Sequence, residues 1–206
     1  KSKNTDMAKD QKSRQKLDPH RKMDIIGILM IVFATLILLA LVSHSSADES
    51  SADLGFGDLV RLFGGDQDIQ ARADMTRNWL GLFGALIAKF FINITIGYFS
   101  VAFPILLGIW GWFIFRKQDV RPLAYYTNYS LILMFLGASF FGLLRLVSWM
   151  PGLSASWAGN IGDFTAGIVA RLIGTTGGII GILTTIVVLA IVVVDYDIHR
   201  TVERLK

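Results

Sequence analysis

Four long apolar stretches dominate this chain and restrict the folds that it can adopt. The first, Ile25 to Val42, holds 18 uncharged residues, enough for a helix to cross a hydrocarbon core of about 30 Å. Because lipid offers backbone groups no water to bond, helices are the spanning structures that such stretches form. Only 17% of the residues are charged, against roughly a quarter in a soluble domain. The sequence therefore predicts an all-α integral membrane protein.

We expect about four transmembrane helices with short outer amphipathic segments. The stretch Trp79 to Phe115 would be about 55 Å long as one straight helix, so we expect a break near Gly97 or Pro104. The sequence leaves open whether the amphipathic segments 79–93 and 164–173 lie flat or extend the spans. The predicted membrane domain is 24–195, with spans near 24–43, 95–115, 129–147 and 175–194.

The distribution of charge predicts the orientation. Residues 1–23 carry eight Lys or Arg, and further cations occupy the loop 116–121 and the C-terminal end. The loop 43–78 is acidic, and the loop 148–162 has no Lys or Arg. Because cytoplasmic flanks of membrane helices are enriched in Lys and Arg, we expect both termini in the cytoplasm. Residues 1–23 are then a basic tail, and 196–206 start a cytoplasmic linker of a longer protein.

Polar side chains give little indication of chemistry. Cys is absent, the three histidines stand apart, and no Gly-x-x-x-x-Gly-Lys-Ser/Thr phosphate loop occurs, so we expect no catalytic, cofactor-binding or metal-binding residue. Asp66 and Asp68 are better explained as part of a solvated loop than as a cation site. Lys89 is expected to reach the outer headgroups by snorkelling, and a role in transport is the alternative.

Small residues at helical spacing are the candidate functional residues. A separation of four places two small residues on one helix face, where they permit close approach of another backbone. We expect them to pack helices within the chain, and association between copies is the alternative. The candidates are Gly81, Gly84, Ala85, Ala88, Gly174, Gly177, Gly178 and Gly181.

Two of the segments that hold these residues resemble each other. Asn78 to Lys89 aligns with Asn160 to Arg171, and both precede a span predicted to run from outside to inside. This similarity suggests two helical hairpins related by duplication. Chance similarity is the alternative, because small residues are common in membrane helices.

The order of the motifs resembles a known family over most of residues 22–194. Asn78-Trp-Leu-Gly81-Leu-Phe-Gly84-Ala85-Leu-Ile-Ala88 is similar to an Asn-Leu-Gly-x-x-Gly-Ala-x-x-Ala signature. Gly97-Tyr98, Pro104 and Gly111-Trp112 follow before Arg116-Lys117, and Gly174 to Gly178 is similar to a glycine-rich entry to the last span. In these features the chain resembles the N-terminal four-helix membrane domain of FtsK/SpoIIIE-type bacterial DNA translocases. Val192 to Asp197 departs from the Thr-Gly-x-Ser-Trp-like end that the family often has.

The resemblance implies a membrane-anchoring domain that acts in cell division and chromosome segregation. It implies a location in the inner membrane at the division septum, a homo-oligomer (a hexamer in the family), and contacts with division proteins and the lipid bilayer. Binding of DNA, ATP and magnesium is implied only for a motor domain that would follow this portion. The alternative is a small four-helix accessory subunit of a larger membrane complex. A transporter is disfavoured because few polar residues line the spans.

Overall fold

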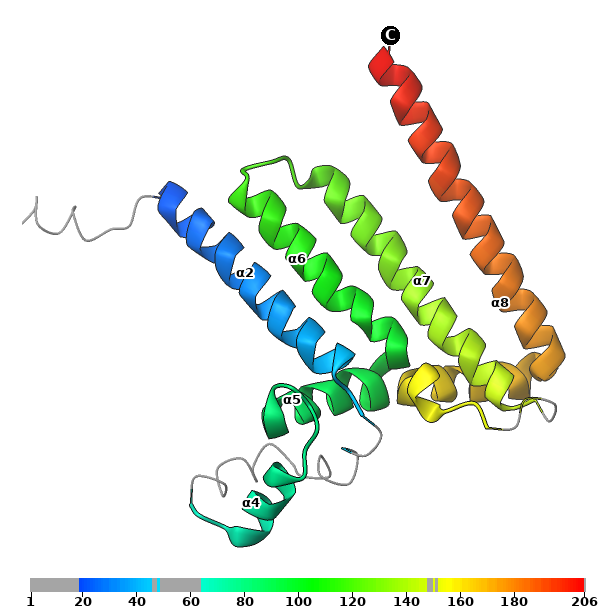
Figure 1. Ribbon diagram of the computed structural model, residues 1–206. Coiled ribbons are helices and arrows are strands. Elements are labelled where there is room, and N and C mark those ends of the chain that lie inside the picture. Colours follow the sequence, from blue (N-terminus) through cyan, green and yellow to red (C-terminus); the bar gives the residue numbers. More distant parts are fainter. Residues whose placement is uncertain (1–18, 46–47, 49–63, 148–149, 151, 206) are drawn as a thin grey trace, which may run out of the picture.

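Four helices of the computed structural model are long and apolar enough to cross a membrane, which confirms the predicted fold class. They lie within residues 21–42, 81–115, 121–145 and 159–194. The structure describes residues 19–45, 48, 64–147, 150 and 152–205, with the backbone alone at 19–20 and 195–205. The spanning helices stand in a row in chain order (Figure 1).

The first hairpin consists of α2 (Pro19–Val42) and α6 (Ala102–Phe115). Two glycines bring these helices into backbone contact, since a Cβ at Gly27 would lie 2.8 Å from the Gly111 carbonyl oxygen. With 14 residues, α6 is only about 21 Å long. The 3₁₀ turn η3 (Gly97–Val101) precedes it and adds about 10 Å, so the two together cross the membrane. Pro104 lies in the first turn of α6, where its missing N–H costs little.

The second hairpin consists of α7 (Arg121–Arg145) and α8 (Gly159–Leu205). The sequence placed the third span near 129–147, whereas α7 begins eight residues earlier, with a proline in its first turn. The short turn η4 (Ala155–Trp157) precedes α8. Inside α8, Gly174 has non-helical angles (φ 77°, ψ 159°) and divides the helix into 159–173 and 175–205. The fourth span therefore starts at Thr175, and its helix continues to Leu205.

A layer of helices lies across one end of the four spanning helices, crosswise to them, and we call it the platform. It consists of α5 (Gly81–Ala88), the π-helical η2 (Lys89–Ile96) and residues 159–173 of α8. Figure 1 shows α5 and the first part of α8 running crosswise beneath the spans. The amphipathic segments that precede the second and fourth spans thus lie flat against the bundle and do not extend the spans.

In the described part of the acidic loop 43–78, residues Gln67–Asp74 form a helix, α4, that the sequence did not indicate. Asp66 is its N-cap, and the Asp66 carboxylate accepts a hydrogen bond from the Asp68 backbone N–H at 3.2 Å. Ile69 packs from this helix against Leu82 and Leu86 of α5. Asp66 therefore has a capping function, and most of the preceding loop (46–47 and 49–63) lies outside the described residues.

Candidate functional site: a platform that joins two hairpins

Four glycines with positive φ angles frame the two halves of the platform. Gly81 (φ 61°) and Gly97 (φ 68°) bound the half made by α5 and η2, while Gly159 (φ 64°) and Gly174 (φ 77°) bound the half made by α8. L side chains rarely adopt this region, so glycine permits the sharp turn into and out of each crosswise helix. Each half therefore has the same design: a glycine turn, a flat helix, a second glycine turn and a span.

The two halves meet where Gly97 and Gly159 approach each other. A Cβ at Gly159 would lie 2.5 Å from the Gly97 nitrogen and 2.8 Å from the Ile92 carbonyl oxygen. A Cβ at Gly97 would lie 2.5 Å from the Ser156 carbonyl oxygen. Real Cβ atoms do not approach backbone so closely, so both positions require glycine for space as well as for φ. We call this contact the Gly97–Gly159 junction.

Aromatic rings surround the junction. The Trp157 ring stacks on Phe141 of α7, with centroids 4.9 Å apart and planes 13° apart. The same ring meets Tyr98 of η3 edge-on at 5.3 Å. Trp157 thus contacts one aromatic residue from each hairpin, and such pairs add about 0.5–1.5 kcal/mol beyond the area they bury. Farther from the platform, the Trp110 indole N–H donates to the Thr127 hydroxyl at 2.8 Å and links α6 to α7.

Hydrogen bonds attach the first half of the platform to α2. The Asn78 side-chain amide is buried and donates to the Ala40 carbonyl at 2.8 Å, near the helix end where carbonyls lack intrahelical partners. The Trp79 backbone N–H donates to the Ser43 hydroxyl at 3.2 Å. Ala88 is fully buried against Leu41. The end of α2 is therefore capped by the residues that lead into α5.

An ion pair and small residues attach the second half to α7. The Arg145 guanidinium pairs with the Asp163 carboxylate, and its Nε–H donates to the Leu153 carbonyl at 3.2 Å. Gly162 lies directly on Ala138, because a Cβ at Gly162 would be 2.6 Å from the Ala138 carbonyl oxygen. The Ser139 and Thr165 hydroxyls share a hydrogen bond of 2.7 Å across the same contact.

The structure brings four of the eight predicted small residues into close packing. Gly84, Ala85 and Ala88 are buried in the platform. Gly178 is buried against α7, and its Cβ would lie 3.0 Å from the Leu143 side chain. In contrast, Gly81 and Gly174 make the turns described above, Gly177 has only Ile173 of its own helix nearby, and Gly181 faces open space. Packing within the chain is therefore seen for the first four residues, while association between copies stays a prediction for Gly177 and Gly181.

The internal similarity reappears in the structure with a different register. The glycine turns pair Gly81 with Gly159, which differs by one helical turn from the pairing of Asn78 with Asn160. In the structural register, Gly84 and Ala88 correspond to Gly162 and Ala166, and all four are buried. Equivalent small residues are therefore buried in both flat helices, with Ala88 against Leu41 of α2 and Gly162 against Ala138 of α7.

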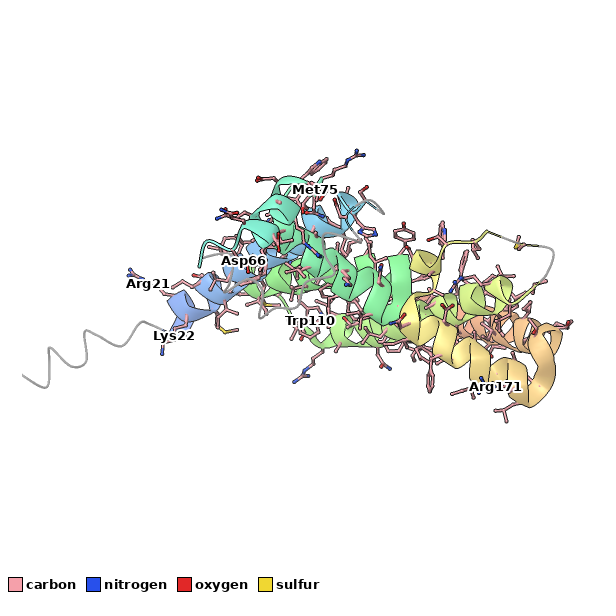
Figure 2. The ribbon with its side chains drawn as sticks, turned by 90° about the horizontal axis from the view of Figure 1, so that it is seen from below. Arg21, Lys22, Asp66, Met75, Trp110 and Arg171 are labelled. Carbon is pink, nitrogen blue, oxygen red and sulfur yellow. The ribbon has the colours of Figure 1, made fainter. Side chains whose placement is uncertain are left out.

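Sequence reasoning missed the Gly27–Gly111 contact, Trp157 and the Arg145–Asp163 pair. The sequence held a signal for the ion pair. Arg145 ends one helix and Asp163 lies near the start of the next, so opposite charges stand on either side of the loop 146–158. Lys89 lies in the platform at the start of η2, before the turn at Gly97, and its snorkelling stays a prediction. Figure 2 shows Arg171 on the flat part of α8.

Cations gather where the spanning helices end on the side opposite the platform, and we call this the basic end. Arg21, Lys22, Arg116, Lys117 and Arg121 are all exposed there. The Lys117 ammonium lies 3.6 Å from the Asp24 carboxylate, and the Arg116 guanidinium carbon lies 5.1 Å above the Trp112 ring centroid. Within the residues that the structure describes, no group of three or more His, Cys, Asp or Glu is arranged to hold a metal ion. The arrangement therefore supports membrane placement and helix association.

Comparison with known proteins agrees with this arrangement. The family model described as the 4TM region of DNA translocase FtsK/SpoIIIE matches residues 20–206. The DNA translocase FtsK of Chlorobaculum tepidum is 32% identical over 108 residues, which cover 52% of this chain and 13% of that protein. The match thus spans about an eighth of the curated relative. No solved structure matches the chain.

Proposed function

The chain belongs to the family of 4TM regions of the DNA translocases FtsK/SpoIIIE, and we propose that it is the membrane anchor of such a motor. Family membership favours this function over the accessory-subunit alternative. The supporting structural observation is α8, which runs without a break from Thr175 to Leu205. The helix extends about 16 Å beyond Val194, the last residue of the apolar span. In this proposal, α8 fixes the position of a motor that follows it in the chain.

The proposed anchor has both termini in the cytoplasm. The basic end, the start of α2 and the end of α8 lie on the same side of the row, and the platform with α4 lies on the other (Figure 1). Cytoplasmic flanks carry the excess of Lys and Arg, so the platform lies at the outer surface of the inner membrane. Catalysis, ATP, magnesium and DNA belong to the motor in this proposal, and the membrane region contributes none of them.

Self-association at the septum is the second part of the proposal. The spanning part of α8 is exposed on most sides beyond Ile182, with Val187, Ile191 and Val194 more than half accessible. Gly177 and Gly181 lie on this helix without contacts to another helix, and such small residues permit close helix approach in lipid. A second copy of the chain, in a homo-oligomer such as the family's hexamer, is the proposed neighbour of α8. Division proteins are the proposed partners of the platform.

The mass of the endogenous protein tests the anchor. An antibody raised against residues 43–78 is used on native membranes, and a species several times heavier than 22.8 kDa is expected. A species near 22.8 kDa contradicts the proposal and favours an accessory subunit. A reporter fused after Lys206 should give a cytoplasmic signal, and one inserted in the loop 43–78 an external signal. The reverse pattern would overturn the orientation without affecting the family assignment.

A further inference from the structure

An apolar groove runs between α2 and α6 and ends beneath the basic end. Its volume is about 470 Å³, within the range of pockets that hold small molecules. Ile31 and Leu38 line it from α2, and Ile105, Gly108 and Trp112 line it from α6. Because both helices cross the membrane, the groove opens at the depth of the hydrocarbon core.

The groove offers few hydrogen-bonding groups, since the Thr35 hydroxyl and the Trp112 indole N–H are the polar side-chain groups of its lining. The Thr35 hydroxyl donates to the Ile31 carbonyl of its own helix at 2.9 Å. A polar ligand would lose most of its hydrogen bonds to water without replacement, at a cost of several kcal/mol. A hydrocarbon chain has no hydrogen bonds to lose. The lining therefore selects an apolar, flexible occupant.

A cation lies at the mouth of the groove. Trp112 lines the groove with about half of its surface accessible, and the Arg116 guanidinium lies over its ring. A guanidinium held by its face keeps its N–H donors at the edge, where they suit bidentate contact with a phosphate. Among the described residues no carboxylate pairs with Arg116, whereas Lys117 is paired with Asp24. Arg21 and Lys22 project from the start of α2, as Figure 2 shows.

From this combination we infer a binding site for one anionic phospholipid, with an acyl chain in the α2–α6 groove and the phosphate at Arg116. An apolar channel at hydrocarbon depth that ends at an arginine in the headgroup region matches both parts of such a lipid. A second copy of the chain matches less well, because in the same membrane orientation it would bring the exposed cations of its own basic end beside Arg116, and like charges repel. The site depends on membrane insertion alone, so it stands or falls separately from the motor anchor.

The test uses the full chain in phosphatidylcholine vesicles with a trace of chain-spin-labelled phosphatidylglycerol or phosphatidylcholine. Electron paramagnetic resonance measures the motionally restricted fraction of each label, and hence the preference for the anionic lipid. Arg116→Gln should lower that preference about fivefold, the expected effect of one cation at a membrane surface. Arg121→Gln is the matched control: it removes an equally exposed cation at the same end, from α7 rather than the groove. That variant should change the preference less than twofold.

Filling the groove tests the acyl-chain part separately. Gly108→Leu should reduce the restricted fraction of both labels, whereas Gly167→Leu, at an open glycine in the flat part of α8, should not. Thr35→Leu fills the groove from the opposite wall and replaces Gly108→Leu if that variant does not fold. Equal effects of Arg116→Gln and Arg121→Gln would show diffuse attraction only and overturn the site. Unchanged lipid restriction in the filled variants, or a change in oligomer size in its place, would assign the groove to something other than a lipid.

Discussion

The two hairpins share a topology but differ in how far their helices stay together. In the first hairpin, α2 and α6 remain in contact to the basic end, where Gly27 and Gly111 bring the backbones together. In the second, α7 and α8 pack from the platform to about Ile186 and then separate (Figure 1). Without a hydrophobic force between helices in lipid, close approach at small residues determines where two helices remain paired. The position of glycine therefore explains the difference.

The difference assigns separate tasks to the hairpins. In the first, closed hairpin, α2 and α6 contact each other along their length and leave a groove on their surface. In the second, open hairpin, the far part of α8 is free to contact other helices. The platform connects them, because α6 and α7 contact each other only weakly within the row. If this comparison is right, the platform junction should affect the stability of the whole domain, and the glycines within each hairpin should affect one half only.

The largest effect is expected at the junction. Gly159→Ala adds a Cβ at φ 64°, which costs about 1–2 kcal/mol, and that atom overlaps the backbone of Thr95 and Gly97. Overpacking adds about 1–3 kcal/mol, so the free energy of unfolding should fall by about 3 kcal/mol. Unfolding in mixed micelles of increasing denaturing-detergent fraction measures the change.

Gly81→Ala is the matched control for the junction variant. Gly81 has a similar φ of 61° but nothing within 4 Å of the added Cβ, so the variant isolates the conformational cost. We expect a loss of about 1 kcal/mol. Equal losses for the two variants would show that the junction contributes no packing, and the hairpins would have to be held together elsewhere.

A smaller effect should distinguish the hairpins themselves. Gly111→Ala places a Cβ 2.8 Å from the Gly27 carbonyl oxygen and 2.9 Å from the Met30 Cβ, and it should destabilise the first hairpin by about 1–2 kcal/mol. Gly181→Ala in the second hairpin meets nothing within 4 Å and should change stability by less than about 0.5 kcal/mol. Equal sensitivity at the two sites would contradict the comparison between a closed and an open hairpin.

The sequence predicted the number of spans and their helical structure correctly. Long uncharged stretches specify a helix in lipid because the backbone has no other way to satisfy its hydrogen bonds. Gly97 was also recognised as a break, since no single helix from Trp79 to Phe115 fits a bilayer. The direction of the flat helices was not predictable, because an amphipathic segment beside a span has the same composition whether it bends or continues.

The contacts of individual glycines were the harder part. Gly178 and Gly181 are four-residue partners of Gly174 and Gly177 in one short stretch, yet Gly178 is buried, Gly181 is open and Gly174 turns the chain. Spacing identifies a helix face but not what lies opposite, which depends on the bend at Gly174 itself. For the same reason Gly27 and Gly111, which lie far apart in the sequence, gave no local signal of their contact.

The smallest predicted effects concern the ion pair of each hairpin. Arg145 and Asp163 are about one-third accessible and join α7 to the platform, and Arg145 also binds the Leu153 carbonyl. In the other pair Lys117 is about half exposed, while Asp24 is as accessible as Asp163; the two lie 3.6 Å apart and join the end of α6 to α2. Exposed pairs contribute about 0–1 kcal/mol, and partial burial with an added hydrogen bond places the first pair at the upper end of that range.

Double-mutant cycles separate the coupling within each pair from the effect of losing either residue alone. With Arg145→Gln and Asp163→Asn we expect a coupling energy of about 1 kcal/mol. With Lys117→Gln and Asp24→Asn we expect a smaller coupling energy of about 0.3 kcal/mol. Raising the salt concentration should weaken the second coupling more, because Lys117 is more accessible to counterions than Arg145. The open hairpin would then depend on a polar contact where the closed one depends on glycine packing. A larger coupling for Lys117 and Asp24 would show that charge also holds the closed hairpin together at the basic end.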